Sequence, residues 1–150
     1  MLKTIEIKNR KAKHDYHFLQ SFEAGIMLAG TEVKSIKAGH ANLSDAYCFF
    51  NGGELWVHSL YIKEYQQGAY NNHDTRKDRK LLLNKSELKK LARKAEDKGV
   101  TIIPYRMFVN DRGFIKLEIY LAEGKKSYDK RETIKERDTT RELERSYRVR

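Results

Sequence analysis

Three absences in this 150-residue sequence limit where the protein can act. It has a single cysteine, Cys48, so it cannot form an intramolecular disulfide. No segment approaches the roughly 20 apolar residues of a membrane-spanning helix. The first 16 residues also lack the apolar stretch of a signal peptide. We therefore expect a cytoplasmic protein that does not associate with membranes.

The motifs of common catalytic and cofactor sites are missing as well. Neither phosphate-binding pattern, GxxxxGKS/T or GxGxxG, occurs, and no serine or cysteine lies in a nucleophile motif. The five histidines are scattered, and no cysteine or carboxylate cluster completes a metal site. His14 next to Asp15 is compatible with a general base, but a phosphate contact or a capped turn is the favoured interpretation. The sequence thus predicts no enzyme activity, no cofactor and no metal.

Positive charge is concentrated in three segments of the chain. The 31 Lys and Arg residues exceed the 21 Asp and Glu residues, which gives a net charge of +10. Residues 1–14, 76–98 and 124–150 contribute +4, +6 and +4, whereas residues 15–75 carry −4 and residues 99–123 are neutral. Basic segments around a neutral to acidic body are typical of a surface that binds a polyanion. Nucleic acid is the favoured partner over an anionic membrane.

The first half of the chain predicts short strands and one short helix. Residues 16–30 are interpreted as one strand region that is interrupted or bent near Gly25. Residues 31–39 predict a short helix that ends at a glycine. Asn-Gly-Gly at 51–53 separates two apolar segments and predicts a hairpin, because Asn and Gly tolerate the positive φ angles of tight turns.

The second half predicts a loop, a helix and another hairpin. Residues 63–78 lack periodicity and predict a long exposed loop. Asn84 is a helix N-cap, followed by apolar residues at helical spacing up to Gly99 and by a basic opposite face. Residues 100–122 predict a hairpin whose second strand alternates cleanly. Five or six strands with one helix predict a mainly β barrel of the oligonucleotide-binding type, with the helix capping one end.

The last 27 residues differ from this predicted body, which comprises residues 1–123. Residues 124–150 hold ten basic and six acidic side chains. On a helix, Ile134 and Leu143 would lie about half a turn apart, so no apolar stripe forms. We expect this tail to be disordered alone. It has no Gly or Pro after Gly124, so a binding partner can make it helical.

A basic run just before the predicted helix favours RNA as the polyanion. Its cations are Arg76, Lys77, Arg79 and Lys80. The neighbouring loop supplies planar side chains: Tyr65, Tyr70, Asn71 and Asn72. Cations for phosphates together with planar groups for bases are typical of binding to single-stranded or looped RNA. The alternative interpretation of this run of charges is a solvent-exposed face that binds no ligand.

Glu32 is an unusual acid because it lies near basic residues and in a segment expected to be at least half-buried. One interpretation is a salt bridge to Lys34 or Lys37. The other is a carboxylate that accepts hydrogen bonds from a base amino group or a sugar hydroxyl. The sequence leaves both open.

Five motifs occur in an order that resembles one known family. They are NRKAKHDY (9–16), GTEVKS (30–35), RKLLLNKSELKKL (79–91), GVTIIP (99–104) and GKKSYDKR (124–131). Together they resemble the SmpB family, the partners of transfer-messenger RNA in bacterial trans-translation. The resemblance extends from about Lys8 to the C-terminus.

The resemblance implies a monomeric, non-enzymatic RNA-binding protein. In this family an oligonucleotide-binding barrel holds the tRNA-like domain of transfer-messenger RNA. The complex, with elongation factor Tu, enters the vacant A site of a stalled ribosome. The tail is taken to become helical in the empty mRNA channel and to reach the decoding centre of the 16S rRNA.

Matching positions imply two sets of site residues. Glu32, Lys34, Leu91 and Lys125 match positions tied to RNA binding, and the residues expected on the same surface are Asn9, Lys11, His14, Tyr16, Asn42, Arg79 and Lys80. Those expected at the decoding centre are Tyr128, Asp129, Lys130, Arg131, Ile134, Lys135 and Arg137. Leu91 also lies on the apolar stripe of the predicted helix, which is compatible with a role in packing.

The chain departs from the family's pattern at three residues. Tyr128 stands where the family more often has His, which is compatible with stacking but not with a charged imidazole. Thr75 replaces a common Pro, and Lys77 replaces an Arg, which removes a bidentate phosphate contact.

Without the resemblance, two other classes remain. A structural ribosomal protein or general RNA chaperone with the same barrel would bind RNA without preferring a tRNA-like fold. A small nuclease is disfavoured, because the sequence lacks the pair of carboxylates or histidines that such chemistry uses.

Overall fold

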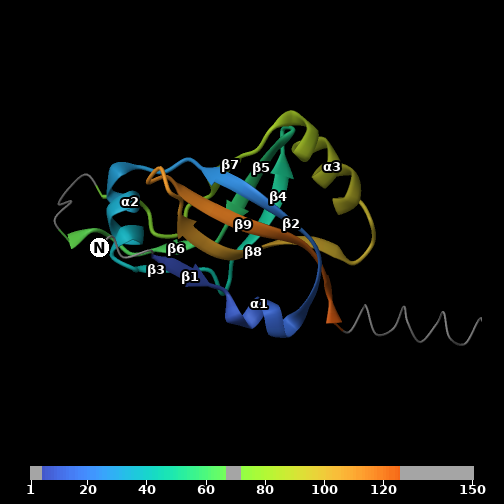
Figure 1. Ribbon diagram of the computed structural model, residues 1–150, viewed down its shortest axis with the longest axis horizontal. Coiled ribbons are helices and arrows are strands. Elements are labelled where there is room, and N and C mark those ends of the chain that lie inside the picture. Colours follow the sequence, from blue (N-terminus) through green and yellow to red (C-terminus); the bar gives the residue numbers. More distant parts are fainter. Residues whose placement is uncertain (1–4, 67–71, 126–150) are drawn as a thin grey trace, which may run out of the picture.

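The computed structural model describes residues 5–66 and 72–125 (Figure 1). In these residues, three helices and nine strands follow one another along the chain. The helices are α1 (Arg10–Asp15), α2 (Gly30–Lys37) and α3 (Lys85–Ala95). The strands are β1 (Glu6–Lys8), β2 (Tyr16–Ile26), β3 (Ala41–Asn42), β4 (Tyr47–Asn51), β5 (Glu54–His58), β6 (Tyr61–Ile62), β7 (Arg79–Leu82), β8 (Val100–Val109) and β9 (Ile115–Gly124).

Six of the strands close into an antiparallel barrel (Figure 1). Around the barrel, β8, β4, β5, β7, β2 and β9 are hydrogen-bonded in turn, and β9 pairs again with β8. β4 pairs with the first part of β8, at Ile102, and β1 pairs with its last part, where Glu6 lies opposite Phe108. The predicted mainly β barrel is confirmed, with six strands in the ring.

The alternation of side chains along the strands fills the barrel. On β9, every second residue is buried, as the sequence predicts: Ile115, Leu117, Ile119 and Leu121. These residues join one core cluster with apolar residues of β2, β4, β5, β7 and β8. Cys48 belongs to this cluster, and burial raises the pKa of its thiol, so the sulfur acts as a packing group.

The predicted hairpin at 51–53 is confirmed. Asn51 of β4 pairs with Glu54 of β5, which leaves a two-residue turn between the strands. Its two residues, Gly52 and Gly53, have φ angles of 62° and 78°. Only glycine adopts two successive positive φ angles without steric cost, so this dipeptide fixes the register of β4 against β5.

β2 is one continuous strand, and its irregularity does not lie at Gly25. The pairing of β2 with β9 shifts register between Phe18 and Gln20, so Leu19 forms a β-bulge. Gly25 pairs with strands on both sides, and a Cβ there would lie 3.3 Å from the Cβ of Leu82. The prediction of a bend at Gly25 is therefore wrong; the glycine allows β7 to approach β2 closely.

α3 covers one end of the barrel, as predicted. Asn84 caps the helix, and its Oδ1 accepts a hydrogen bond of 2.8 Å from the Glu87 amide. The helix ends at Ala95, about one turn before Gly99, whose φ of 84° lies in the turn into β8. Leu91 is completely buried in the core cluster. Its side chain therefore holds α3 against the barrel.

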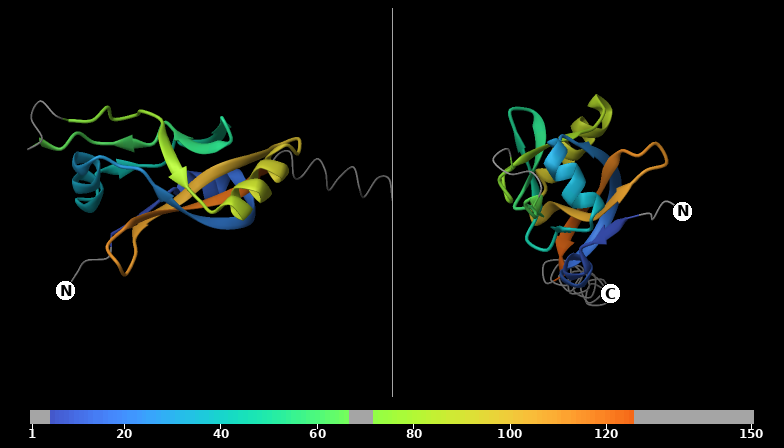
Figure 2. Two further views of the ribbon diagram at one scale, coloured as in Figure 1. Left: turned by 90° about the horizontal axis from the view of Figure 1, so that it is seen from above. Right: turned by 90° about the vertical axis from the view of Figure 1, so that its left-hand side faces the viewer.

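The other two helices lie away from α3 (Figure 2). α2 and the small sheet of β3 and β6 lie at the opposite end of the barrel. α1 packs its Ala12 against Ile103 and Ala122 on the outside of the barrel, and neither it nor β1 was expected from the sequence. Within residues 5–66 and 72–125, no helix has the length and apolar character needed to cross a membrane.

Leu91→Ala should destabilise the protein by about 2–5 kcal/mol, because it removes buried methyl groups and leaves a cavity under α3. Lys90→Ala, at the adjacent exposed position, should change the free energy of unfolding by less than about 0.5 kcal/mol. Chemical denaturation of both variants measures the difference. Equally small effects would contradict the packing role of Leu91.

Candidate nucleic-acid interface

A buried ion pair joins α2 to β7. The Nε of Arg79, the first residue of β7, donates a hydrogen bond to Oε2 of Glu32 in the first turn of α2. The two side chains are 0% and 1% exposed. The rest of the guanidinium is also used: Nη1 donates to the Leu60 carbonyl at 2.6 Å, and Nη2 donates to the carbonyls of Asp74 and Thr75 at 3.1 and 3.3 Å. Arg79 thus ties α2 to the segment between β6 and β7.

The predicted position of Arg79 on the RNA-facing surface is wrong. The basic run continues into a strand, and strand alternation places Arg79 and Leu81 on the inner side. Lys80 remains on the outer side, where its Nζ lies 3.5 Å from Glu54 and the side chain is 32% exposed. Only Lys80 of these two cations can reach a phosphate.

Glu32 is held in its charged form. Burial alone would raise the pKa of its carboxyl. Hydrogen bonds from the Ala29 amide and the Arg79 guanidinium, with the charges of Arg79 and Lys77, outweigh burial and lower the pKa. The Ala29 bond is 2.8 Å, and Lys77 Nζ lies 3.4 Å from Oε1. The predicted salt bridge exists, but Lys34 and Lys37 are not its partners.

Two pairs of a cation and an aromatic ring lie near this ion pair. Lys34 Nζ is 5.3 Å from the ring centre of Tyr65, and Arg76 Cζ is 5.3 Å from that of Tyr61. Tyr61 and Tyr65 also line one open pocket. Its other lining residues belong to the segment between β6 and β7: Lys63, Glu64, Gln66, Asn72 and Thr75. Exposed cations beside half-buried planar rings suit the phosphates and bases of looped RNA.

The segment 63–78 was predicted as a long exposed loop, but its described part is anchored at several points. His73 is 8% exposed; its Nε2 donates to the Ile62 carbonyl and its Nδ1 accepts from the Thr31 hydroxyl, both at 2.9 Å. Asn72 bonds to both the amide and the carbonyl of Tyr65. The prediction of a wholly exposed loop is therefore wrong. Tyr70 and Asn71 lie outside the described residues.

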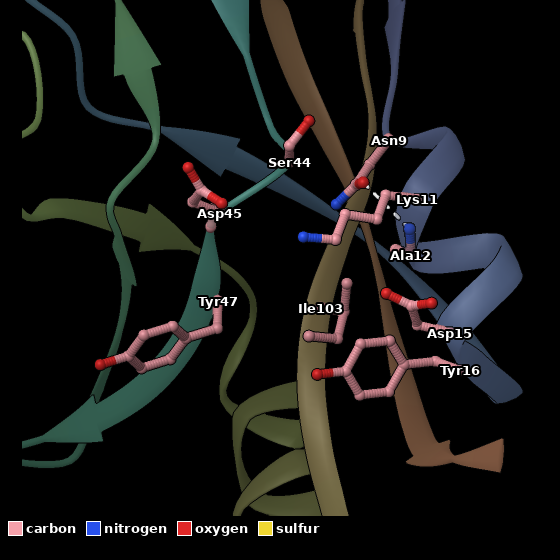
Figure 3. Close-up of a pocket in the computed structure, with 10 residues that line it drawn as sticks. Asn9, Lys11, Ala12, Asp15, Tyr16, Ser44, Asp45, Tyr47 and Ile103 are labelled. Carbon is pink, nitrogen blue, oxygen red and sulfur yellow. Dashed lines mark hydrogen bonds between the residues drawn. The ribbon is translucent and has the colours of Figure 1, made fainter. Parts of the chain in front are cut away.

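Asn9 and α1 form a second part of the interface. Asn9 is 2% exposed; its Nδ2 donates to the carbonyls of Leu43 and Pro104, and its Oδ1 accepts from the Ala12 amide. It therefore caps α1 and fixes the helix to the barrel. Together with Asn9, Lys11 and Tyr16 line an open pocket between α1 and the segment before β4 (Figure 3).

The remaining predicted residues are spread over the molecule. His14 is exposed and lies 3.1 Å from Asp15. Asn42 accepts a hydrogen bond from the Ser44 amide and shapes the segment before β4. Lys125 is exposed and directly follows Gly124, which pairs with Tyr16 next to α1. Leu91 is core, as its helical spacing indicates.

The structure thus brings the predicted residues into two groups. Glu32, Lys34 and Arg79 meet at α2, whereas Asn9, Lys11, Tyr16 and Lys125 meet near α1. Arg76 Nη1 lies 3.8 Å from Asp45 and connects the two groups. Sequence reasoning missed Tyr47, Tyr61 and His73, because a single Tyr or His near a strand end carries no signal of its own. The predicted tail residues Tyr128, Asp129, Lys130, Arg131, Ile134, Lys135 and Arg137 lie outside the described residues.

Neither part of the interface resembles a metal centre. Across the described part of the chain, no three His, Cys, Asp or Glu side chains are grouped as metal ligands. Glu32 and Asp45 instead lie beside cationic side chains, and Asp15 lies beside His14.

A family model described as SmpB protein matches residues 6–149. The chain belongs to the SmpB protein family. The predicted resemblance is confirmed over nearly the full length. A relative named SsrA-binding protein, from Phocaeicola vulgatus, is 53% identical over 144 residues, which cover 96% of each chain. Another of that name, from Bacteroides thetaiotaomicron, is 51% identical over 145 residues and 97% of each chain.

One solved structure supports the same conclusion for the SmpB fold. It is described as "tmRNA-SmpB: a journey to the center of the bacterial ribosome". Its chain matches with a TM-score of 0.69 and 46% sequence identity, over 80% of this chain and 84% of that one.

Glu32→Gln should destabilise this SmpB-family protein by about 3–5 kcal/mol at neutral pH, because it leaves the Arg79 charge buried without its partner. The folded-state pKa of Glu32 is lowered, so its contribution is present at neutral pH and is lost as the pH falls from the unfolded-state pKa through the folded-state pKa. The difference between variant and wild type should therefore shrink on acidification.

Chemical denaturation from neutral pH down to about pH 3 measures this difference. Glu54→Gln, which removes the exposed partner of Lys80, is the matched control and should cost no more than about 1 kcal/mol. A Glu32→Gln effect as small as that of the control, or one that does not change with pH, would contradict the role of the buried pair.

Proposed function

We propose that this SmpB-family protein binds the tRNA-like domain of transfer-messenger RNA and delivers it to stalled ribosomes for trans-translation. The observation that carries this proposal is the α2 surface, where Lys34 and Arg76 each lie over a tyrosine ring and Lys77 lies beside the buried Glu32–Arg79 pair. The relatives named SsrA-binding protein and the solved tmRNA-SmpB complex support the same RNA and the ribosome as partners.

The chemistry of this surface suits binding and not catalysis. Lysine and arginine side chains contact phosphates, whereas Tyr61 and Tyr65 offer faces on which exposed bases stack. Glu32 is enclosed by its own partners, so it contributes by holding the surface in shape. The protein acts in this proposal as a monomeric, cytoplasmic RNA-binding protein with no cofactor.

The tail completes the proposal. Residues 1–123 bind the RNA, and residues 124–150 act on the ribosome, where Tyr128 to Arg137 enter the empty mRNA channel and approach the 16S rRNA decoding centre. The net charge of +4 on this segment supports a location walled by RNA phosphates. Elongation factor Tu would carry the aminoacylated RNA in the same complex.

A chain that ends at Ser127 should bind the isolated tRNA-like domain with nearly wild-type affinity but fail to support peptide tagging on stalled ribosomes.

The variant for comparison is the full-length protein with both Lys34→Ala and Lys77→Ala. It should weaken RNA binding and make the slope of log affinity against log salt shallower by about 0.7–0.9 for each phosphate that the variant no longer neutralises. Filter binding and a reconstituted tagging reaction measure the two properties.

Two outcomes would contradict this proposal. A large loss of binary affinity in the truncated chain would contradict the separate role of the tail. Equal affinity for an elongator tRNA and for the tRNA-like domain would instead favour a general RNA chaperone or ribosomal protein.

A further inference from the structure

The pocket between α1 and the segment before β4 is lined by both aromatic and charged side chains (Figure 3). Tyr16 and Tyr47 lie on opposite sides of it with Ile103 of β8 between them, and the ring of Tyr47 is directed away from Ile103. The polar lining comes from Asn9, Lys11, Asp15, Ser44 and Asp45. An apolar floor between two aromatic side chains is suited to a flat ring system.

The size of the pocket favours a small group. Its volume is about 170 Å³, below the ~300 Å³ at which sites for drug-sized ligands begin. The pocket is also open to solvent, so a ring can enter while the rest of a larger molecule stays outside. A single base that projects from an RNA chain meets both conditions.

The carboxylates of the lining disfavour a phosphate as the occupant. Asp15 and Asp45 contribute two carboxylates, against one ammonium group from Lys11. Phosphate oxygens would be repelled by this net negative lining. The basic side chains that suit the backbone, those of Arg10, Lys13 and Lys125, are exposed outside the pocket.

We propose that this pocket binds an unpaired guanine of the RNA. The Watson–Crick edge of guanine has one acceptor, O6, beside two donors, N1–H and N2–H. A lysine ammonium can donate to O6, and a carboxylate accepts from both donors at once. Adenine and cytosine would present a ring-nitrogen lone pair to the carboxylate, and uracil would present two carbonyl oxygens, so the same groups disfavour these bases.

The pocket is organised before any ligand binds. The ring of Tyr47 lies 5.1 Å from the ring of His58, which supports it from β5. One oxygen of Asp15 faces His14 at 3.1 Å, and one of Asp45 faces Arg76 at 3.8 Å. Each carboxylate therefore has a second oxygen for a ligand. Ordered walls reduce the entropy lost on binding.

The inference rests on the proposed function, because it assumes that RNA reaches this face. It is tested with the full-length protein and three fluorescein-labelled pentaribonucleotides, UUGUU, UUAUU and UUUUU, by fluorescence anisotropy at low salt. The wild type should bind UUGUU most tightly. Tyr47 is 45% exposed, so its substitution removes a wall of the pocket without opening the core.

Tyr47→Ala should weaken binding of UUGUU by roughly 5- to 150-fold, the range expected for the loss of one base–aromatic stack. Tyr47→Phe should retain the affinity, because the ring remains. Asp45→Asn should reduce the preference for UUGUU over UUAUU. Phe114→Ala, which removes an exposed ring outside the pocket, should change nothing.

Equal binding of the three pentaribonucleotides, or an unchanged affinity of Tyr47→Ala for UUGUU, would overturn the inference. The affinity for the tRNA-like domain is measured in parallel. If that domain binds preferentially but guanine is not preferred, the pocket assignment alone is wrong. If guanine is preferred but the tRNA-like domain is not, the proposed function is wrong and the pocket stands.

Discussion

The ion pair between Glu32 and Arg79 is the interaction on which the rest of the interface depends. It lies at the end of the barrel opposite α3 and connects α2, β7 and the segment between β6 and β7. Removing either partner from such a pair costs about 3–5 kcal/mol, a large part of the total stability of about 5–15 kcal/mol of a typical protein. The position of the exposed cations therefore depends on two side chains that solvent does not reach.

This arrangement separates the residues that hold the surface from those that can touch RNA. Asn9, Glu32, Arg79 and Leu91 are buried and use their polar or apolar groups within the protein. Lys11, Lys34, Lys77 and Tyr61 are exposed or half-buried around them. If the protein binds RNA as proposed, a substitution in the first group should act on binding through the fold, whereas one in the second group should act on direct contacts with RNA. The two effects are distinguished by whether stability falls together with affinity.

The sequence was sufficient for features that depend on local pattern. Alternation on β9, the two glycines of the β4–β5 turn and the Asn84 cap each depend on neighbouring residues, so they predicted the barrel and its capping helix. The α1 cap by Asn9 carried the same kind of signal as Asn84, but six residues are too few to show helical periodicity. Gly25 was misinterpreted because a bend and a close strand contact call for the same residue.

Features that depend on distant contacts could not be predicted. Glu32 and Arg79 are 47 residues apart, so the nearby Lys34 and Lys37 were the natural candidates for its partner. Arg79 was placed at the surface because four cations in five residues resemble a solvated run, although strand alternation turns one of them inward. The family resemblance named Glu32 and Arg79 as candidates for RNA binding but could not say that the two side chains contact each other.

In the proposed function, Glu32 influences RNA binding through Arg79 and does not itself touch RNA. The most direct measurement is a double-mutant cycle of the affinity for the tRNA-like domain, with wild type, Glu32→Gln, Arg79→Met and the double variant. If the two residues act as one unit, the double variant should lose no more affinity than the worse single variant. Losses that simply add would show that Glu32 and Arg79 act independently and would contradict this account.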